Sequence, residues 1–367
     1  AMLGSSFGTI FTITTWGESH GKGVGVVVDG CPAGLSLQEE TIQAFLDRRK
    51  PGKSRYSTKR TERDRVQILS GVFEGHTTGT PLSMLVFNTD QRSKDYSEIA
   101  RCYRPGHADY SFDVKYGFHD YRGGGRSSGR ETIGRVAAGA VASQLLKALG
   151  IKLYAYTRSI GPISIRSFSQ DEIGNNSLYM PDAEAAKEAQ QWLESCMQQN
   201  NSSGGLIECI VHGMIPGVGD PIFDKLDANL AKAIMSIGAV KGVEIGDGFA
   251  AAYSTGADNN DAFTLDEQGR ITKLTNHAGG ILGGISDGSD IILRAAFKPT
   301  PSMSAPQKTV TCSGEPTEII IHGRHDPVVV PRAVVVVEAM TAITLADALL
   351  CGMGSRLDNV KKVWHYD

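Results

Sequence analysis

Apolar and polar positions follow strand-like or helical periods along most of the chain, and turn-forming residues separate these segments. The stretch 7–30 predicts two strands joined by a glycine-flanked turn, and 66–88 predicts a hairpin. Further strands are predicted at 151–167, 205–215 and 318–322.

Helical periods fill much of the remaining sequence. Helices are predicted at 37–49, 129–149, 183–199, 223–237 and 331–350. The 129–149 segment consists mostly of small apolar residues, which is typical of a buried, closely packed helix.

Capping residues mark several of these helix starts. Ser36 with Glu39 and Ser128 with Glu131 each predict a capping box, and Asp182 predicts an N-cap.

The order of these elements is mixed rather than a steady β-α-β alternation. Strand pairs come first, then helices, then strand pairs again, which favours an α+β fold with antiparallel sheets. No linker rich in Pro, Ser or charge divides the sequence. We therefore expect residues 1–367 to form a single domain.

Composition narrows the class of protein. The chain has 367 residues and 41% hydrophobic residues, and no apolar run approaches the ~20 residues that span a bilayer, so no membrane association is expected. The six cysteines lack CxxC spacing, which argues against a metal site or a disulfide framework and favours reduced thiols in the cytoplasm.

Charge is unevenly distributed. The net charge of −3 gives no general attraction to nucleic acid, yet eight basic residues lie between Arg48 and Arg63. A cationic patch on a mildly acidic protein suits a small anionic ligand, although a solvated basic loop gives the same pattern.

Two histidines occur on turns that carry candidate chemistry. His20 lies in Gly17–Gly21, between two predicted strands, and His107 lies in the Pro-Gly turn of Tyr103–Tyr110. Imidazole exchanges protons near neutral pH, so both are candidate catalytic groups. Taken singly, a histidine such as His20 is more often structural, whereas the turn at His107 fits a structural and a catalytic histidine equally well.

A glycine- and arginine-rich segment leads into the helix at 129–149. Asp120–Thr132 reads DYRGGGRSSGRET, in which free backbone amides, Arg126 and Arg130 suit an anion such as a phosphate. It matches neither the P-loop nor the GxGxxG pattern. The alternative is a tight turn needed for helix packing.

Basic, hydroxyl and backbone donors recur in the C-terminal half. Three segments carry them, Asn276–Gly284, Lys298–Ser302 and Gly323–Pro327, as an extended phosphate-bearing cofactor would need. Asp326 is a candidate proton acceptor.

Taken together, these segments resemble the chorismate synthase family. The similarity runs from about residue 6 to 350, in the family's order. Its signatures here are GESHG, RRKPGKSR, RPGHADY, YRGGGRSS, VKGVEIGDG, NHAGGILGG and GRHDP.

The resemblance implies a 1,4-anti elimination of phosphate and the C6 hydrogen from 5-enolpyruvylshikimate 3-phosphate, giving chorismate. The family requires reduced FMN although the reaction involves no net redox change. NADPH is a candidate reductant. This chain has no insertion for reducing flavin itself, so an external flavin reductase is expected.

The resemblance also assigns roles to residues. His20 is the general acid at the departing phosphate, His107 protonates or hydrogen-bonds the flavin, and Asp326 helps to relay the C6 proton. Arg49 and Arg55 match positions for NADP or the substrate anion. The residues matching FMN contacts are Arg126, Ser127, Ser128, Gly238, Ala239, Gly283, Lys298, Pro299, Thr300, Pro301, Ser302 and Arg324.

Three positions depart from the family's usual residues. Gly129 stands where Ala is usual, Gly238 replaces Asn or Gln, and Pro301 stands where Ser is common.

The implied fold is a β-α-β sandwich with helices between antiparallel sheets, assembled as a homotetramer.

Two other classes of function remain as alternatives. An RNA- or phosphate-binding module would use the basic segment without catalysis, but the net charge of −3 disfavours it. A flavin oxidoreductase would consume NADPH in proportion to product.

Overall fold

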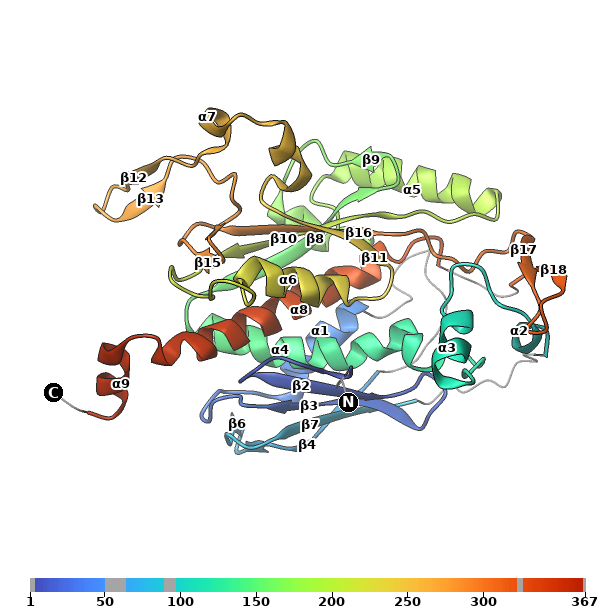
Figure 1. The fold of residues 1–367 in the computed structure, drawn as a ribbon, viewed down its shortest axis with the longest axis horizontal. Helices are drawn as coiled ribbons and strands as arrows, with labels where there is room; N and C mark the ends of the chain where they lie inside the picture. The colour runs from blue at the N-terminus through green and yellow to red at the C-terminus, as the bar shows by residue number, and fades with distance from the viewer. Residues whose placement is uncertain (1–3, 50–63, 89–96, 322–325, 366–367) are drawn as a thin grey trace.

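The computed structural model describes residues 4–49, 64–88, 97–321 and 326–365. Within these residues, two five-stranded sheets enclose a layer of helices (Figure 1). The predicted α+β sandwich, with helices between antiparallel sheets, is confirmed.

The first sheet carries the N-terminal part of the chain. Its strand order is β1-β2-β3-β7-β4, with antiparallel neighbours throughout. Val24, Val26 and Val28 of the central strand are buried, because alternate residues of a strand point to the same face. The strands are β1 (Ser6–Phe7), β2 (Thr12–Gly17), β3 (Gly23–Asp29), β4 (Val66–Ser70) and β7 (Leu82–Phe87).

The predicted hairpin at 66–88 forms, since β4 and β7 pair directly. A small ribbon of β5 (Val72–Phe73) and β6 (His76–Thr77) lies within its connection.

The second sheet has the order β11-β16-β10-β8-β9 and is also antiparallel. Its strands are β8 (Lys152–Ile160), β9 (Ile163–Ser164), β10 (Gly205–His212), β11 (Val240–Ile245) and β16 (Ile291–Phe297). The sequence analysis missed β11 and β16, although Ile291, Leu293 and Ala295 alternate with more exposed residues as in a half-buried strand.

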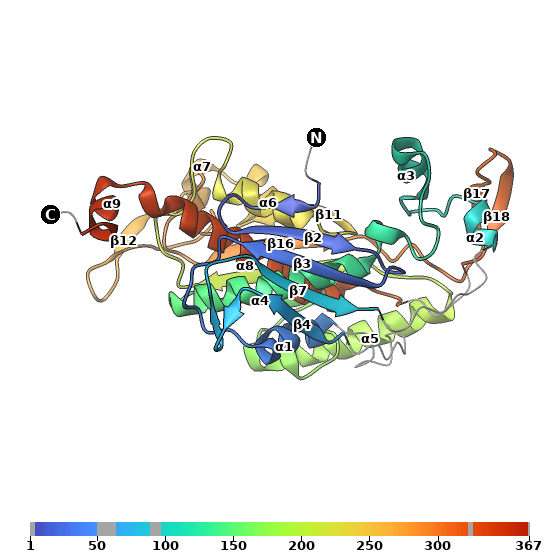
Figure 2. The same cartoon turned by 90° about the horizontal axis from the view of Figure 1, so that it is seen from below.

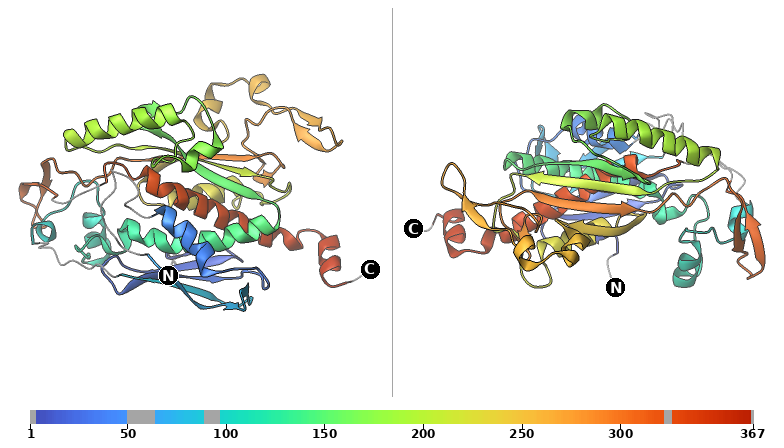
Figure 3. Two further views of the ribbon diagram at one scale, coloured as in Figure 1. Left: turned by 180° about the vertical axis from the view of Figure 1, so that it is seen from behind. Right: turned by 90° about the horizontal axis from the view of Figure 1, so that it is seen from above.

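Among the described residues, four helices lie between the sheets, and a fifth covers the outer face of the second sheet (Figure 3). The inner helices are α1 (Glu39–Arg49), α4 (Thr132–Ala148), α6 (Leu226–Met235) and α8 (Val330–Cys351), and the outer one is α5 (Ala183–Gln198). A Cβ at Gly139 of α4 would lie 2.2 Å from that of Ala339 in α8, so glycine permits this close helix approach.

Helix boundaries confirm some capping predictions and correct others. Asp182 caps α5, because its carboxylate accepts from the backbone amides of Glu184 and Ala185. The capping box predicted at Ser36 is wrong, since the Glu39 carboxylate accepts from the Ile68 amide instead.

The start of α4 differs from the prediction in a similar way. Ser128 accepts from the Arg130 amide, at a 3-10 turn over Gly129–Glu131. Glu131 does not complete a capping box, because its carboxylate binds Arg135.

The expectation that no apolar run approaches membrane-spanning length is corrected by α8. In the described part of the chain, Val330–Gly354 is long and apolar enough to cross a bilayer, yet most of it is buried in the fold. It is the core helix between the sheets.

The remaining elements extend beyond the sandwich at its two ends (Figure 2). One end carries α2 (Ser97–Arg101), α3 (Asp109–Tyr116), β17 (Gln307–Val310) and β18 (Pro316–Ile319), and β18 overlaps the strand predicted at 318–322 only at 318–319. The other carries α7 (Gly256–Asn259), β12 (Phe263–Leu265), β13 (Ile271–Lys273), β14 (Ile281–Leu282), β15 (Ile285–Ser286) and α9 (Leu357–Val363).

Candidate active site

The His20 turn joins β2 to β3. The Ser19 hydroxyl lies 3.1 Å from His20 Nδ1, so these adjacent side chains hydrogen-bond. A Cβ at Gly123 would lie 2.6 Å from His20 Cε1. The glycine-rich segment therefore packs directly against the imidazole, which explains the need for glycine at 123.

A buried charge network is connected to this turn through Asn88, which donates to the Glu18 carbonyl and accepts from Arg130. Arg49 and Arg130 both pair with Asp64, at 3.3 Å and 3.0 Å, and all three side chains are almost completely buried. Arg49 also donates to the Thr132 hydroxyl and the Gly129 carbonyl. Burial, followed by the charge of Arg332, lowers the pKa of Arg49 to about 9.

Asp326 joins the same network from the C-terminal side. Arg332 donates to its carboxylate at 2.9 Å and to the backbone carbonyl of Arg49 at 3.4 Å. Asp326 and the end of α1 are thus linked through one guanidinium, although they are 277 positions apart in the sequence.

His107 is tied to the segment Lys298–Ser302. Its Nδ1 lies 3.0 Å from the Pro105 carbonyl, and its Nε2 lies 3.0 Å from the Ser302 hydroxyl. The carbonyl can only accept, so Nδ1 carries the proton and Nε2 accepts from Ser302 in the neutral ring. Burial and then the charge of Arg104 lower the pKa of His107, which favours that neutral ring.

The glycine run lies between the two histidine turns. A Cβ at Gly124 would lie 4.0 Å from Arg104 Nη2, and Arg104 pairs with Asp109 at 2.7 Å, within the turn that holds His107. Gly123 contacts His20 while its neighbour Gly124 borders the His107 turn. This places the two histidine turns on either side of one glycine-rich segment.

Residues 238 and 239 adjoin Lys298–Ser302 directly. The Lys298 amide donates to the Ala239 carbonyl at 2.9 Å, and the Lys298 ammonium donates to the Gly106 carbonyl at 2.7 Å. A Cβ at Gly238 would have no described atom within 4 Å.

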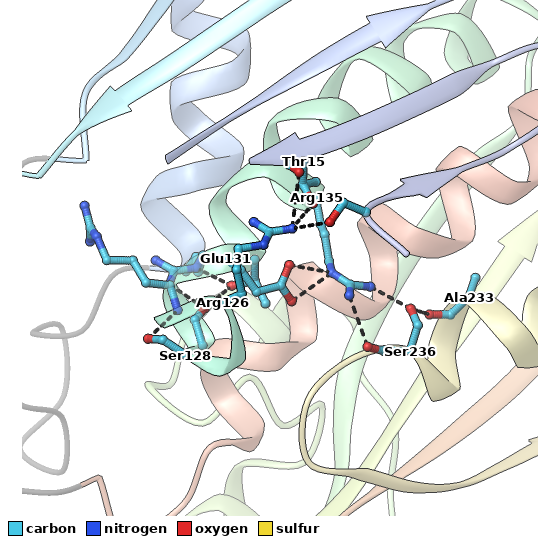
Figure 4. Close-up of polar contacts among 12 residues, drawn as sticks. Thr15, Arg126, Ser128, Glu131, Arg135, Ala233 and Ser236 are labelled. Atoms are coloured by element: carbon cyan, nitrogen blue, oxygen red, sulfur yellow. Dashed lines mark hydrogen bonds and ion pairs between the residues drawn. The ribbon is translucent and has the colours of Figure 1, made fainter. Parts of the chain in front are cut away.

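Arg126 and Arg135 connect the start of α4 to neighbouring elements (Figure 4). Arg126 donates to the Thr15 hydroxyl at 2.8 Å, so its guanidinium is turned towards β2. Arg135 is held by Glu131 and donates to the side chain and carbonyl of Ser236, just beyond α6. Arg135 thereby fixes the segment that leads into Gly238.

Not every residue predicted to contact the cofactor lies near Lys298–Ser302. Gly283 lies in the β14–β15 turn, and the carbonyl of Gly284 accepts from Leu226 at the start of α6, whereas Gly238 follows the end of that helix. The 10-residue helix separates them by roughly 15 Å. Arg55 and Arg324 lie outside the described residues.

The sequence analysis did not identify three other residues of the buried charge network. Asp64, Asn88 and Arg332 make its central contacts. Asp64 closes the basic segment, but no local pattern shows that its carboxylate pairs with two buried arginines.

The segment Lys298–Ser302 presents a polar group that a bound ligand could satisfy. Thr300 Oγ1 is buried and has no hydrogen-bond partner within the described structure. A buried hydroxyl without a partner is costly, so a ligand atom that bonds it would stabilise the site. Ser302 and the backbone at Ala239 add further polar groups nearby.

Comparison with known proteins agrees with this arrangement. The family model described as chorismate synthase matches residues 11–350. The chorismate synthase of Agathobacter rectalis is 66% identical over 98% of both chains, and that of Lachnoclostridium phytofermentans is 65% identical over 99% of this chain and 100% of the relative.

A solved structure is similar over almost the whole fold. This crystal structure of chorismate synthase has a TM-score of 0.76 and 32% sequence identity, covering 98% of this chain and 97% of the other. The sequence signatures, the sandwich and these matches lead to one assignment: the chain belongs to the chorismate synthase family.

Proposed function

We propose that this chain converts 5-enolpyruvylshikimate 3-phosphate to chorismate by 1,4-anti elimination of phosphate, with reduced FMN bound and no net redox change. Membership of the family makes it a lyase of aromatic amino acid biosynthesis that acts on a small molecule and uses a flavin. The contact series from His20 through Gly123, Gly124 and Arg104 to His107 is the observation that carries the proposal.

His20 is the proposed general acid for the departing phosphate. Its turn lies beside the buried network in which two arginines share the single carboxylate of Asp64. Such an excess of positive charge favours binding of the substrate's phosphate dianion close to His20. Arg49 would act on the anion through this network.

The proposed flavin-binding groups are those that adjoin His107. They are Ala239, Lys298, Pro299, Thr300, Pro301 and Ser302, with Ser127, Ser128 and Arg126 holding the glycine-rich segment beside them. Reduced FMN, when bound, supplies electron density that helps the phosphate to leave.

His107 and Asp326 handle protons in this proposal. The Nδ1 proton of His107 is fixed on Pro105, so exchange takes place at Nε2 or the Ser302 hydroxyl. Asp326, held by Arg332, receives the proton released from substrate C6.

The reductant comes from outside the chain in this proposal. Arg49 is matched to NADP or the substrate anion, and its guanidinium donates to Thr132, Asp64 and Gly129. A buried guanidinium engaged in this way favours an anion-binding role over contact with a bulky nicotinamide nucleotide. NADPH would then act through a separate flavin reductase.

An anaerobic assay distinguishes the candidate functions. Chemically reduced FMN without NADPH should give chorismate and phosphate in equal amounts over many turnovers per flavin. Consumption of one reduced flavin per product would instead identify an oxidoreductase. Failure to turn over, together with steeply salt-dependent RNA binding, would support the binding module.

We further propose that the enzyme is a cytoplasmic homotetramer that binds neither nucleic acid nor membrane. All six cysteines are free thiols, as a reducing compartment would maintain. Apolar side chains on the β12–β13 ribbon are exposed, with Phe263 at 64% and Ile271 at 76%, and contact with another copy would cover them.

A further inference from the structure

Asn88, the residue after β7, holds both ends of the His20 turn. Its side-chain amide donates to the Glu18 carbonyl at 2.9 Å and to the Gly21 carbonyl at 2.7 Å. Its backbone amide donates to the Lys22 carbonyl at 3.0 Å. These bonds bracket Ser19 and His20 on both sides.

The orientation of the Asn88 amide is fixed by Arg130. Arg130 Nε lies 2.5 Å from Asn88 Oδ1, and a guanidinium can only donate, so the oxygen faces Arg130 and the NH₂ group faces the two carbonyls. Both amide hydrogens and the amide oxygen are therefore used.

Asn88 also connects the His20 turn to the charge network. Arg130 pairs with Asp64, and Asp64 pairs with Arg49, so one amide joins the turn to two buried cations. A shift of this amide would move the imidazole relative to the groups that receive the substrate's anion.

We propose that Asn88 is a positioning residue for His20, acting through the Glu18 and Gly21 carbonyls. This inference rests on the proposed role of His20 as general acid. A misplacement of about 1 Å at a catalytic group costs on the order of 100-fold in rate, so the geometry of this turn bears on catalysis.

Asn88→Asp is the sharpest variant, because it keeps an acceptor for Arg130 but places carboxylate oxygens against two carbonyl oxygens. We expect kcat to fall by about 10–100-fold while KM and FMN affinity change by less than about threefold. Amide hydrogen exchange at Gly21, measured without ligands, should accelerate at least about tenfold.

Asn176→Asp is the matched control. Asn176 likewise donates to two carbonyls, those of Glu172 and Met180, in a loop beside the second sheet. Its substitution should match the stability loss of Asn88→Asp while kcat and exchange at Gly21 stay close to wild type. Equal kcat losses in the two variants would overturn the proposal.

The double variant separates positioning from a general structural effect. If Asn88 acts through His20, adding Asn88→Asp to His20→Ala should lower kcat by less than about twofold further. Multiplicative losses would contradict the inference. A His20→Ala enzyme with full activity would instead refute the proposed role of His20.

Should Asn88→Asp not fold, Asn88→Gln retains every polar group but displaces the amide by one methylene. A smaller fall in kcat with unchanged KM is then expected. Wild-type kcat together with wild-type exchange at Gly21 would overturn the proposal.

Discussion

At the scale of single residues, the proposed mechanism requires a neutral His107 and a His20 that acts as an acid. Burial and Arg104 lower the pKa of His107, and the Pro105 carbonyl fixes its tautomer. The ordinary pKa of histidine is 6.5, so below that pH the His107 ring is protonated more readily in the unfolded chain than in the folded protein. This difference lowers the free energy of unfolding as the pH falls.

Replacing Arg104 tests this electrostatic account. Arg104→Gln removes a positive charge beside His107 and exposes it to the unneutralised carboxylate of Asp109, so the pKa of His107 should rise. The stability that the wild type loses below about pH 6.5 should be partly retained in the variant.

NMR titration of the His107 ring proton measures this change. The largely exposed His212 provides the reference signal in both proteins. A His107 pKa that is unchanged or lower in the variant would contradict the account.

The two histidines should each matter for turnover. We expect His20→Ala and His107→Ala to lower kcat by roughly 10²–10⁴, the usual contribution of a positioned acid or base. Steady-state rates with reduced FMN in excess measure the effect, and FMN binding to each variant shows whether the cofactor is still held. Unchanged rates would remove the proton-transfer assignment.

The sequence made His20, His107 and Asp326 candidate catalytic residues because they stand in distinctive motifs. It did not identify Asp64 or Asn88, because their partners come from segments far apart in the chain: Asn88 contacts Glu18 and Arg130. Patterns within a segment record its own period and turns. They do not record which segments meet.

At the scale of elements, most helices and the N-terminal strands were predictable because their burial is periodic. Strand β16 was missed although it lies inside the second sheet, between β11 and β10, since a short apolar run flanked by loops is ambiguous without its neighbours. The capping box at Ser36 was wrong because Glu39 finds a partner in β4 that only the folded chain provides.

Packing of α4 against α8 gives a prediction at this scale. Gly139→Ala should destabilise the protein by about 1–3 kcal/mol, because the new Cβ would meet Ala339 at 2.2 Å and the helices must separate. Gly129→Ala is the matched control, since a Cβ there would have no described atom within 4 Å.

Denaturant unfolding measures both glycine variants. We expect Gly129→Ala to remain near the wild-type midpoint and to keep its activity. A Gly139→Ala variant as stable as wild type would contradict the close helix contact.

At the scale of the whole molecule, the proposed tetramer and single domain have separate tests. Light scattering should give four times the chain mass of 39.2 kDa, and a monomer would contradict the assembly. Replacing both Phe263 and Ile271 with Ser should shift the population towards smaller species if the β12–β13 ribbon is buried between copies.

The single domain is tested by calorimetry. A single calorimetric transition would support one cooperative domain.

The organisation of the molecule also explains how the site forms. The His20 turn comes from the first sheet, whereas the segment after β16 that pairs with His107 extends from the second. Arg135 of α4 donates to Ser236 at the end of α6, and this bond holds the two helices together between the sheets (Figure 4). The site therefore depends on the sandwich as a whole.

A crystal structure with FMN and substrate bound tests the central claim most directly. The account predicts that His20 hydrogen-bonds the phosphate, within about 3.2 Å, and that the His107–Ser302 pair and Asp326 contact the flavin or the substrate in the same cavity. Placement of either histidine or Asp326 in a different cavity from the bound substrate would contradict it.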